Sequence, residues 1–254
     1  MIIADTHLHL YPHYDFEQAL QGCVLRLAGL APDATCVGFL AERSGCSVFS
    51  SLMQKECNGI VGDVSVAPTT DGHCLVVHGF NTPPLYLCPG RQIVTEERIE
   101  VLCLTVDAEI PDGLPAELAV QRIREVGGVP VLTWAVGKWL FRRARVVRDL
   151  LARFGPDELL VGDSAMRPTF WATPLPMRFA RRHGYRVLAG SDPLAAAGEE
   201  QVMGSYASLM HAEFDPKCVR ASLRSALLHP EGEIQSVGVR SGLVTFIRRM
   251  LNSR

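Results

Sequence analysis

Short apolar runs alternate along the chain with longer segments in which apolar residues recur at helical spacing. Seven of the runs predict β-strands, near residues 1–6, 35–41, 90–94, 100–106, 129–133, 158–162 and 186–190. The longer segments predict helices over residues 15–29, 115–126, 138–154, 174–183, 216–228 and 240–252. Strands that alternate with helices are typical of βαβ units around a parallel sheet.

Two stretches modify this pattern. Residues 74–88 read as two short strands around an Asn-Thr-Pro-Pro turn, so we expect a hairpin inserted before the third strand. Residues 200–254 read as a C-terminal helical segment. No repeat divides the chain, and no linker rich in glycine, proline or serine does so either. We therefore expect one domain over residues 1–254.

Composition narrows the class of protein. With 254 residues, of which 48% are hydrophobic, the chain can fill a sizeable core. The net charge of −2 lacks the basic excess of a nucleic-acid binder. No apolar run is long enough to span a membrane, and the N-terminus does not resemble a signal peptide. The eight cysteines include no C-x-x-C pair, and Cys36, Cys74 and Cys103 lie in apolar runs. We expect a reduced, cytoplasmic protein whose cysteines are structural.

The first predicted strand ends in D-T-H-L-H, which places Asp5, His7 and His9 at every second position. Side chains at alternate positions of a strand point the same way. The spacing predicts one carboxylate and two imidazoles in a common space, as a metal site requires. A solvated turn would carry the same residues.

Polar residues also follow most of the other strands. The carboxyl ends of parallel strands meet at one edge of a barrel, where functional side chains gather. Each of these polar residues, taken alone, has a plainer explanation. An aspartate after a strand commonly caps a helix, and a lysine or arginine commonly lies at the surface. Only their convergence with the histidine pair points to chemistry. These residues are Glu42, Arg43, Gln92, Glu100, Lys138, Asp163, Arg167 and Asp192.

The strand ends resemble the polymerase and histidinol phosphatase (PHP) superfamily of metal-dependent phosphoesterases. The family carries D-x-H-x-H on its first strand and G-S-D-A-H on its last, and this chain has D-T-H-L-H and G-S-D-P-L. The resemblance covers residues 1–194. With the seven strands, it predicts an α/β fold that is a distorted, seven-stranded, TIM-like (β/α)7 barrel.

Carried over by residue, the resemblance implies one metal site and the loss of the others. One of the family's ions would be bound by His7, His9 and Asp192, and Gln92 stands where the family has a glutamate ligand. The remaining ligands are replaced, since the corresponding positions hold Glu42, Arg43, Glu100, Thr133, Trp134 and Leu194. A guanidinium cannot bind a cation. We therefore expect at most one divalent ion, which would be zinc, manganese or iron.

Two functions remain open from the sequence. The first is a mono-metal hydrolase of a phosphate ester or another small anionic substrate, with Glu42, Glu100 or Asp163 as general base and Lys138 and Arg167 stabilising negative charge. The second is a non-catalytic barrel without an ion, which binds an anionic ligand or a protein partner. We predict that the Arg43 side chain occupies the space of a lost ion and pairs there with a carboxylate. The alternative is that the Arg43 side chain is exposed to solvent. The oligomeric state cannot be read from the sequence.

Overall fold

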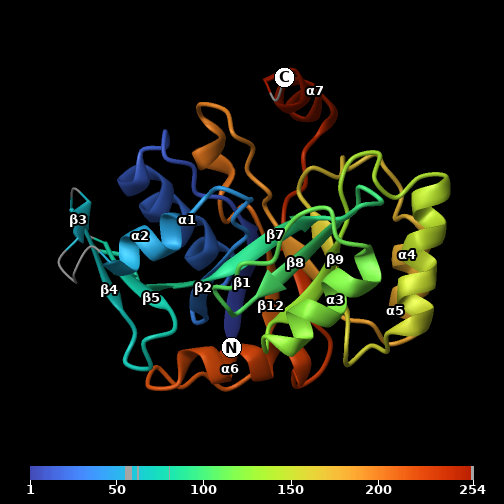
Figure 1. Ribbon diagram of the computed structural model, residues 1–254. Coiled ribbons are helices and arrows are strands. Elements are labelled where there is room, and N and C mark those ends of the chain that lie inside the picture. Colours follow the sequence, from blue (N-terminus) through green and yellow to red (C-terminus); the bar gives the residue numbers. More distant parts are fainter. Residues whose placement is uncertain (55–58, 62, 80, 253–254) are drawn as a thin grey trace.

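The computed structural model describes residues 1–54, 59–61, 63–79 and 81–252 (Figure 1). Within these residues the strands are β1 (Ile2–Leu8), β2 (Thr35–Leu40), β3 (Gly59–Val61), β4 (Val64–Pro68), β5 (Leu75–His78), β6 (Leu85–Cys88), β7 (Gly90–Val94), β8 (Glu100–Leu104), β9 (Val129–Thr133), β10 (Leu160–Ser164), β11 (Val187–Gly190), β12 (Tyr206–Met210) and β13 (Gln235–Gly238). The helices are α1 (Phe16–Leu30), α2 (Val48–Gln54), α3 (Ala116–Glu125), α4 (Arg142–Arg153), α5 (Leu175–Arg182), α6 (Val219–Leu228) and α7 (Leu243–Asn252), and Glu199–Val202 forms a 3-10 turn.

The strands form two sheets and not a closed barrel. The first sheet has eight strands in the order β13-β12-β1-β2-β6-β5-β4-β3, and the second has five in the order β11-β10-β9-β8-β7. A barrel requires a hydrogen-bonded ladder around its whole circumference. No strand ladder joins the two sheets within the described residues. The prediction of a seven-stranded TIM-like barrel is therefore wrong, and the fold is a mixed α/β arrangement of two sheets with helices around them.

The direction of the strands also departs from the predicted alternation of parallel strands and helices. β8 is antiparallel to both of its neighbours, β7 and β9. Only residues 95–99 connect β7 to β8, with Thr95 N–H donating to the carbonyl of Ile99 at 3.0 Å. A parallel pair needs a crossover of a dozen or more residues, so a connection this short can only make an antiparallel pair.

The two sheets nevertheless approach each other where β1 and β2 end. The N–H of Asp192, two residues after β11, donates to the carbonyl of His7 at 2.9 Å. On the other side, Glu42 N–H donates to Gly90 O at 3.1 Å and Gln92 N–H donates to Glu42 O at 2.8 Å. These bonds bring together the ends of β1, β2 and β11 and the middle of β7.

Two of the predicted segments also differ from the structure, and α2, β3 and β4 were not predicted. The predicted hairpin forms, because β5 and β6 pair antiparallel. It is part of the sheet and not an insertion, since β6 also pairs in parallel with β2. The predicted helical segment 200–254 contains the strands β12 and β13 as well as α6 and α7, and residues 253–254 lie outside the described part.

Most helices bury the faces that their periodicity predicts, but in α7 the apolar residues Leu243, Val244 and Leu251 are exposed and Arg249 is buried. In α1, Asp15 accepts a hydrogen bond from Gln18 N–H at 3.0 Å and so caps the helix, whose apolar face packs on the first sheet. Figure 1 shows α3, α4 and α5 beside the second sheet and α7 at the opposite end of the molecule from α6. The arginine-rich α4 buries Val147, Leu150 and Leu151.

The structure also bears on the cysteines and on membrane insertion. Cys36, Cys74 and Cys103 are fully buried as free thiols, as their apolar neighbours predict. Across the described helices, none combines the length and the apolar character that crossing a bilayer requires.

Candidate metal centre

The end of β1 carries the two histidines into the interior. β1 lies between β2 and β12, and all seven of its residues are buried. The side chains of His7 and His9 are 2% and 5% exposed. The alternative of a solvated turn at this position is therefore wrong.

Asp5 does not join the histidines, although the sequence pattern places all three together. Its carboxylate accepts hydrogen bonds from the backbone N–H groups of His7 (3.2 Å), Ser191 (2.9 Å) and Gly204 (2.8 Å). The pairing of β1 with β2 shifts register between Asp5 and Leu8, so strict alternation does not hold across this irregularity. Burial raises the pKa of Asp5 to about 6. Asp5 thus ties β1 to later segments of the chain.

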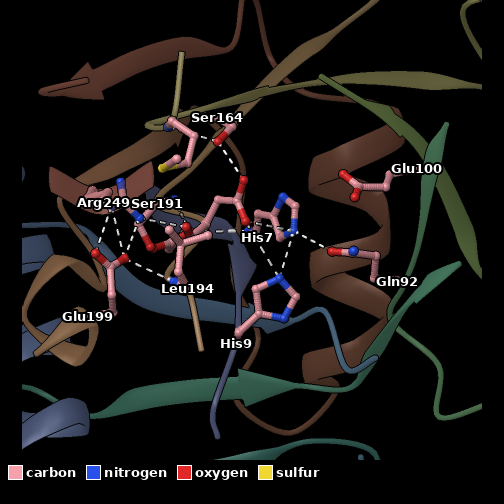
Figure 2. A network of polar contacts seen from close by, with 12 residues as sticks. His7, His9, Gln92, Glu100, Ser164, Ser191, Leu194, Glu199 and Arg249 are labelled. Atoms are coloured by element: carbon pink, nitrogen blue, oxygen red, sulfur yellow. Dashed lines mark hydrogen bonds and ion pairs between the residues drawn. The ribbon is translucent and has the colours of Figure 1, made fainter. Parts of the chain in front are cut away.

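Four side chains from three parts of the chain converge at one point (Figure 2). His7 Nε2 lies 3.1 Å from His9 Nε2 and 3.0 Å from Gln92 Oε1. Asp192 Oδ1 lies 3.6 Å from His7 Nε2 and 3.7 Å from His9 Nε2. The ligand atoms of His7, His9 and Asp192 all lie within 4.8 Å of one another. The structure therefore brings together the four residues that the resemblance implied for one ion.

Burial and neighbouring side chains set the pKa values of His9 and Asp192. Burial lowers the pKa of His9 to about 3, and the neighbouring His7 acts in the same direction. Burial alone would raise the pKa of Asp192, but His7, His9, the Ser164 hydroxyl and Arg249 outweigh it, so the pKa is lowered. Ser164 donates to Asp192 Oδ2 at 2.8 Å. The cluster thus presents a carboxylate beside a neutral imidazole of His9.

The donor set fits a divalent cation. His7 Nε2 faces an imidazole nitrogen, an amide oxygen and a carboxylate oxygen, and a single N–H cannot serve three acceptors. A cation at this point can be bound by all four groups. The other ring nitrogen, His7 Nδ1, is buried without a hydrogen-bond partner within the described structure. Two imidazoles and one carboxylate form a set that zinc, iron and manganese accept, and the amide oxygen of Gln92 is a weaker fourth ligand.

Glu42 is directed to α2, whereas Arg43 lies close enough to His9 for its charge to lower the pKa of that imidazole. The Glu42 carboxylate accepts a hydrogen bond from Phe49 N–H at 2.8 Å and so satisfies a backbone donor in the first turn of α2. Burial raises the pKa of Glu42. Arg43 is exposed. The ion pairs found between described residues do not include it, so the predicted pairing with a carboxylate is not observed there. Burial raises the pKa of Tyr11, and the nearby Arg43 guanidinium opposes that rise.

Glu100 and Lys138 form an ion pair beside the cluster. Lys138 Nζ lies 2.5 Å from Glu100 Oε1, and the two side chains are 27% and 11% exposed. Figure 2 shows Glu100 next to Gln92, as expected because Glu100 pairs with Val94, two positions after Gln92 on β7. The ion pair therefore lies on the strand next to the one that carries Gln92.

Asp163 and Arg167 pair with each other. Arg167 donates from Nε to Asp163 Oδ1 at 2.7 Å and from Nη2 to Oδ2 at 2.5 Å, and the Tyr206 hydroxyl donates to Oδ2 at 3.0 Å. Both charged residues are buried, at 1% and 4% exposed. The predicted separate roles, a base and a free cation, conflict with this geometry, because the two charges already satisfy each other.

Sequence reasoning missed a second buried ion pair that supports the cluster. Arg249 of α7 donates to the carbonyl of Asp192 at 2.8 Å and to Glu199 Oε2 at 2.7 Å (Figure 2). Glu199 Oε2 also accepts from Leu194 N–H at 3.0 Å. Helical spacing places Arg249 on the polar side of α7, so the hydrophobic pattern gave no signal that this arginine is buried.

Comparison with known proteins shows a likeness in fold. The sequence matches no family model and no curated protein. PsfC from Pseudomonas syringae PB-5123 superposes with a TM-score of 0.61 at 12% identity, over 99% of this chain and 96% of that one. The lesion-specific endonuclease PfuEndoQ from Pyrococcus furiosus superposes with a TM-score of 0.53 at 11% identity. This second match covers 92% of this chain but 57% of the endonuclease, and at such identities the likeness concerns the fold alone.

Proposed function

We propose that this protein is a PHP-like metal-dependent hydrolase that uses one divalent ion to cleave a phosphate ester or another small anionic substrate. The observation that carries the proposal is the convergence of His7 Nε2, His9 Nε2, Gln92 Oε1 and Asp192 Oδ1 at a single buried point. The likeness in fold to a lesion-specific endonuclease is compatible with it.

His7, His9 and Asp192 would hold the ion, with Gln92 as a weaker fourth ligand. A bound divalent ion polarises a phosphoryl oxygen and lowers the pKa of water. In the reaction, the oxygen of water bonds to phosphorus while the bond from phosphorus to the ester oxygen breaks. The leaving oxygen takes up a proton.

Among the acidic candidates for general base, Glu100 is the one we retain. Glu42 is directed to the start of α2, and both oxygens of Asp163 accept from the Arg167 guanidinium, so we place neither carboxylate beside the attacking water. Glu100 lies beside Gln92 and shares a hydrogen bond with Lys138. The Lys138 ammonium adds positive charge where the phosphate would lie.

One observation favours a second candidate, a non-catalytic protein that binds an anionic ligand. All three carboxylates proposed from the sequence as bases already accept hydrogen bonds from other groups of the protein. In this alternative the cluster and Lys138 would bind a phosphate without cleaving it.

Metal reconstitution tests the proposal. Protein stripped with a chelator is dialysed against zinc, manganese or iron(II), and its metal content and its hydrolysis of p-nitrophenyl phosphate are measured. We expect about one ion per chain, and we expect metal-dependent hydrolysis that is lost in His9→Ala and Asp192→Ala. The matched control is His183→Ala, at an exposed histidine at the end of α5.

The stoichiometry and the activity separate the possible outcomes. Two or more ions per chain would refute the single site, and no ion in the presence of excess metal would refute the metal centre. One bound ion without hydrolysis of any phosphate ester would favour the binding protein.

A further inference from the structure

A separate cavity is lined by α2, the turn between β4 and β5, the residues that follow β8, and α6. Its volume of about 500 Å³ is within the range of small-molecule sites. Glu100, which Figure 2 shows next to Gln92, is the first residue of β8, and Thr105, which lines the cavity, follows the last. At about 3.3 Å per residue, Thr105 lies about 16 Å along the strand from Glu100. The cavity is therefore distinct from the metal centre.

Thr105 has a strained backbone and a hydroxyl without a partner. Its φ of 74° lies in the left-handed region, which β-branched residues rarely adopt, and its N–H is held by the carbonyl of Pro89 at 3.0 Å. The residue is only 1% exposed, and its Oγ1 has no hydrogen-bond partner within the described structure. Buried polar groups are normally bonded, and strain of this kind clusters at sites that hold ligands. Thr105 thus offers a ligand one buried donor and acceptor.

One end of the cavity is basic. Arg220 of α6 and His73 lie there, and both also line an adjoining hollow beside Arg224. Asp71 fixes the two segments relative to each other, because its carboxylate accepts from His73 N–H at 3.3 Å and from Arg220 N–H at 2.9 Å. The Arg220 guanidinium itself takes part in no ion pair between described residues.

The other end of the cavity is acidic. Asp107 accepts from the Ser50 hydroxyl at 2.8 Å, and both residues also line a second hollow, to which Arg220 and His73 do not contribute. In the part of the chain that the structure describes, no ion pair includes Asp107. Arg220 and Asp107 are therefore too far apart to pair with each other. One cavity thus holds an unpaired cation and an unpaired anion, and apolar side chains supply much of the remaining lining, namely Phe49, Met53, Pro89, Val106 and Val126.

We propose that this cavity binds a small zwitterion with an apolar body, of the kind that a short apolar peptide with free ends represents. The carboxylate of the ligand pairs with the Arg220 guanidinium, whose parallel donors match two oxygens. The ammonium pairs with Asp107, and the peptide group between them bonds to the Thr105 hydroxyl. The proposal is independent of the metal centre and of hydrolysis.

Three dipeptides that differ only at their ends test the proposal. Calorimetry compares leucyl-leucine with N-acetyl-leucyl-leucine, which lacks the ammonium, and with leucyl-leucine amide, which lacks the carboxylate. We expect each capped peptide to bind about tenfold more weakly or worse. Leucyl-leucine should bind equally to metal-loaded and metal-stripped protein. Absence of binding, equal binding of the three peptides, or binding that requires the metal overturns the proposal.

Substitutions then assign the two ends. In Arg220→Met the preference for leucyl-leucine over its amide disappears, and in Asp107→Asn the preference over the acetylated peptide disappears. Thr105→Val keeps the shape of the side chain without the hydroxyl and weakens the binding of leucyl-leucine several-fold. The matched control is Arg148→Met, at an exposed position of α4, which changes none of these affinities. Preferences that survive in both end variants, or an equal loss in Arg148→Met, overturn the proposal, and the comparison of the three peptides on the unaltered protein decides for any variant that does not fold.

Discussion

Replacement of Arg249 by methionine tests how α7 supports the segment that carries Asp192. The guanidinium donates to both Glu199 oxygens at 2.7–3.0 Å, to Ser241 Oγ at 3.2 Å and to the carbonyl of Asp192 at 2.8 Å. Arg249 and Glu199 are 2% and 6% exposed. Methionine fills a similar space but leaves the carboxylate of Glu199 buried without a counter-charge.

The expected loss of stability is large. Breaking a buried ion pair by removal of one partner costs about 3–5 kcal/mol, because the other charge stays desolvated. For a domain of this size each kcal/mol shifts Tm by about 2–4 °C, so the fall is about 6–20 °C. Removal of both charges in Glu199→Gln/Arg249→Met avoids the stranded charge, so the double variant is expected to be more stable than Arg249→Met by about 2 kcal/mol.

The assay combines urea unfolding with a metal titration of each variant. Because Arg249 also positions the carbonyl of Asp192, metal affinity in Arg249→Met is expected to fall about 10–100-fold, as for other groups that orient a ligand residue. Arg248→Met, at an exposed neighbour on the same helix, should change stability by no more than about 0.5 kcal/mol. The reasoning is refuted if the double variant is as unstable as the sum of the two single variants, or if Arg249→Met behaves like Arg248→Met.

Three further predictions concern the site and its surroundings. Gln92→Glu replaces an amide oxygen by a carboxylate at the cluster and should raise divalent metal affinity about tenfold or more, as measured by calorimetry. Gly190→Ala would place a Cβ 2.4 Å from His7 Cβ and 2.6 Å from its backbone nitrogen, so it should lower both Tm and metal affinity. Asp163→Asn strands the buried guanidinium of Arg167 and should cost about 3–5 kcal/mol in urea unfolding, with metal content unchanged.

Two of these variants, Gln92→Glu and Gly190→Ala, have a matched control. Gln201→Glu adds the same charge at an exposed position and should leave metal affinity unchanged. Gly29→Ala meets no atom within 4 Å and lies in α1, where alanine should stabilise by about 0.5–1 kcal/mol. A drop in metal content in Asp163→Asn would place that residue in the site after all, and unchanged affinity in Gln92→Glu would remove Gln92 from it.

The hydrophobic pattern located the elements well but not their partners. Periodicity reports which face of a segment is buried, and it placed β7 and β9 at the residues where they occur. It carries no information on which strand pairs with which. The short connection 95–99 held the decisive clue, since it allows only an antiparallel pair. The short strand β13 has exposed and polar residues, so no apolar run marked it.

The candidate site likewise has residues that local sequence patterns predicted and contacts that they did not. His7, His9 and Asp192 were predictable because motif spacing and strand ends are local features. Asp163 is held by Arg167, four residues later in a loop, and by the distant Tyr206, and the motif pattern predicted neither contact. Glu199 and Arg249 are separated by 50 residues, and no local pattern predicts that they meet.

The position of β1 inside its sheet has a consequence for biosynthesis. One edge of β1 pairs with β2, which follows within 40 residues, and the other pairs with β12 at Tyr206–Met210. At about 5–20 residues per second, a ribosome needs about 8–33 s to travel from the end of β2 to the start of β12. During that interval the nascent chain holds an apolar strand with one unsatisfied edge, which is a template for pairing with other chains. We expect ribosome-bound chains that stop before β12 to recruit chaperones, and chains that extend past it to be released from them.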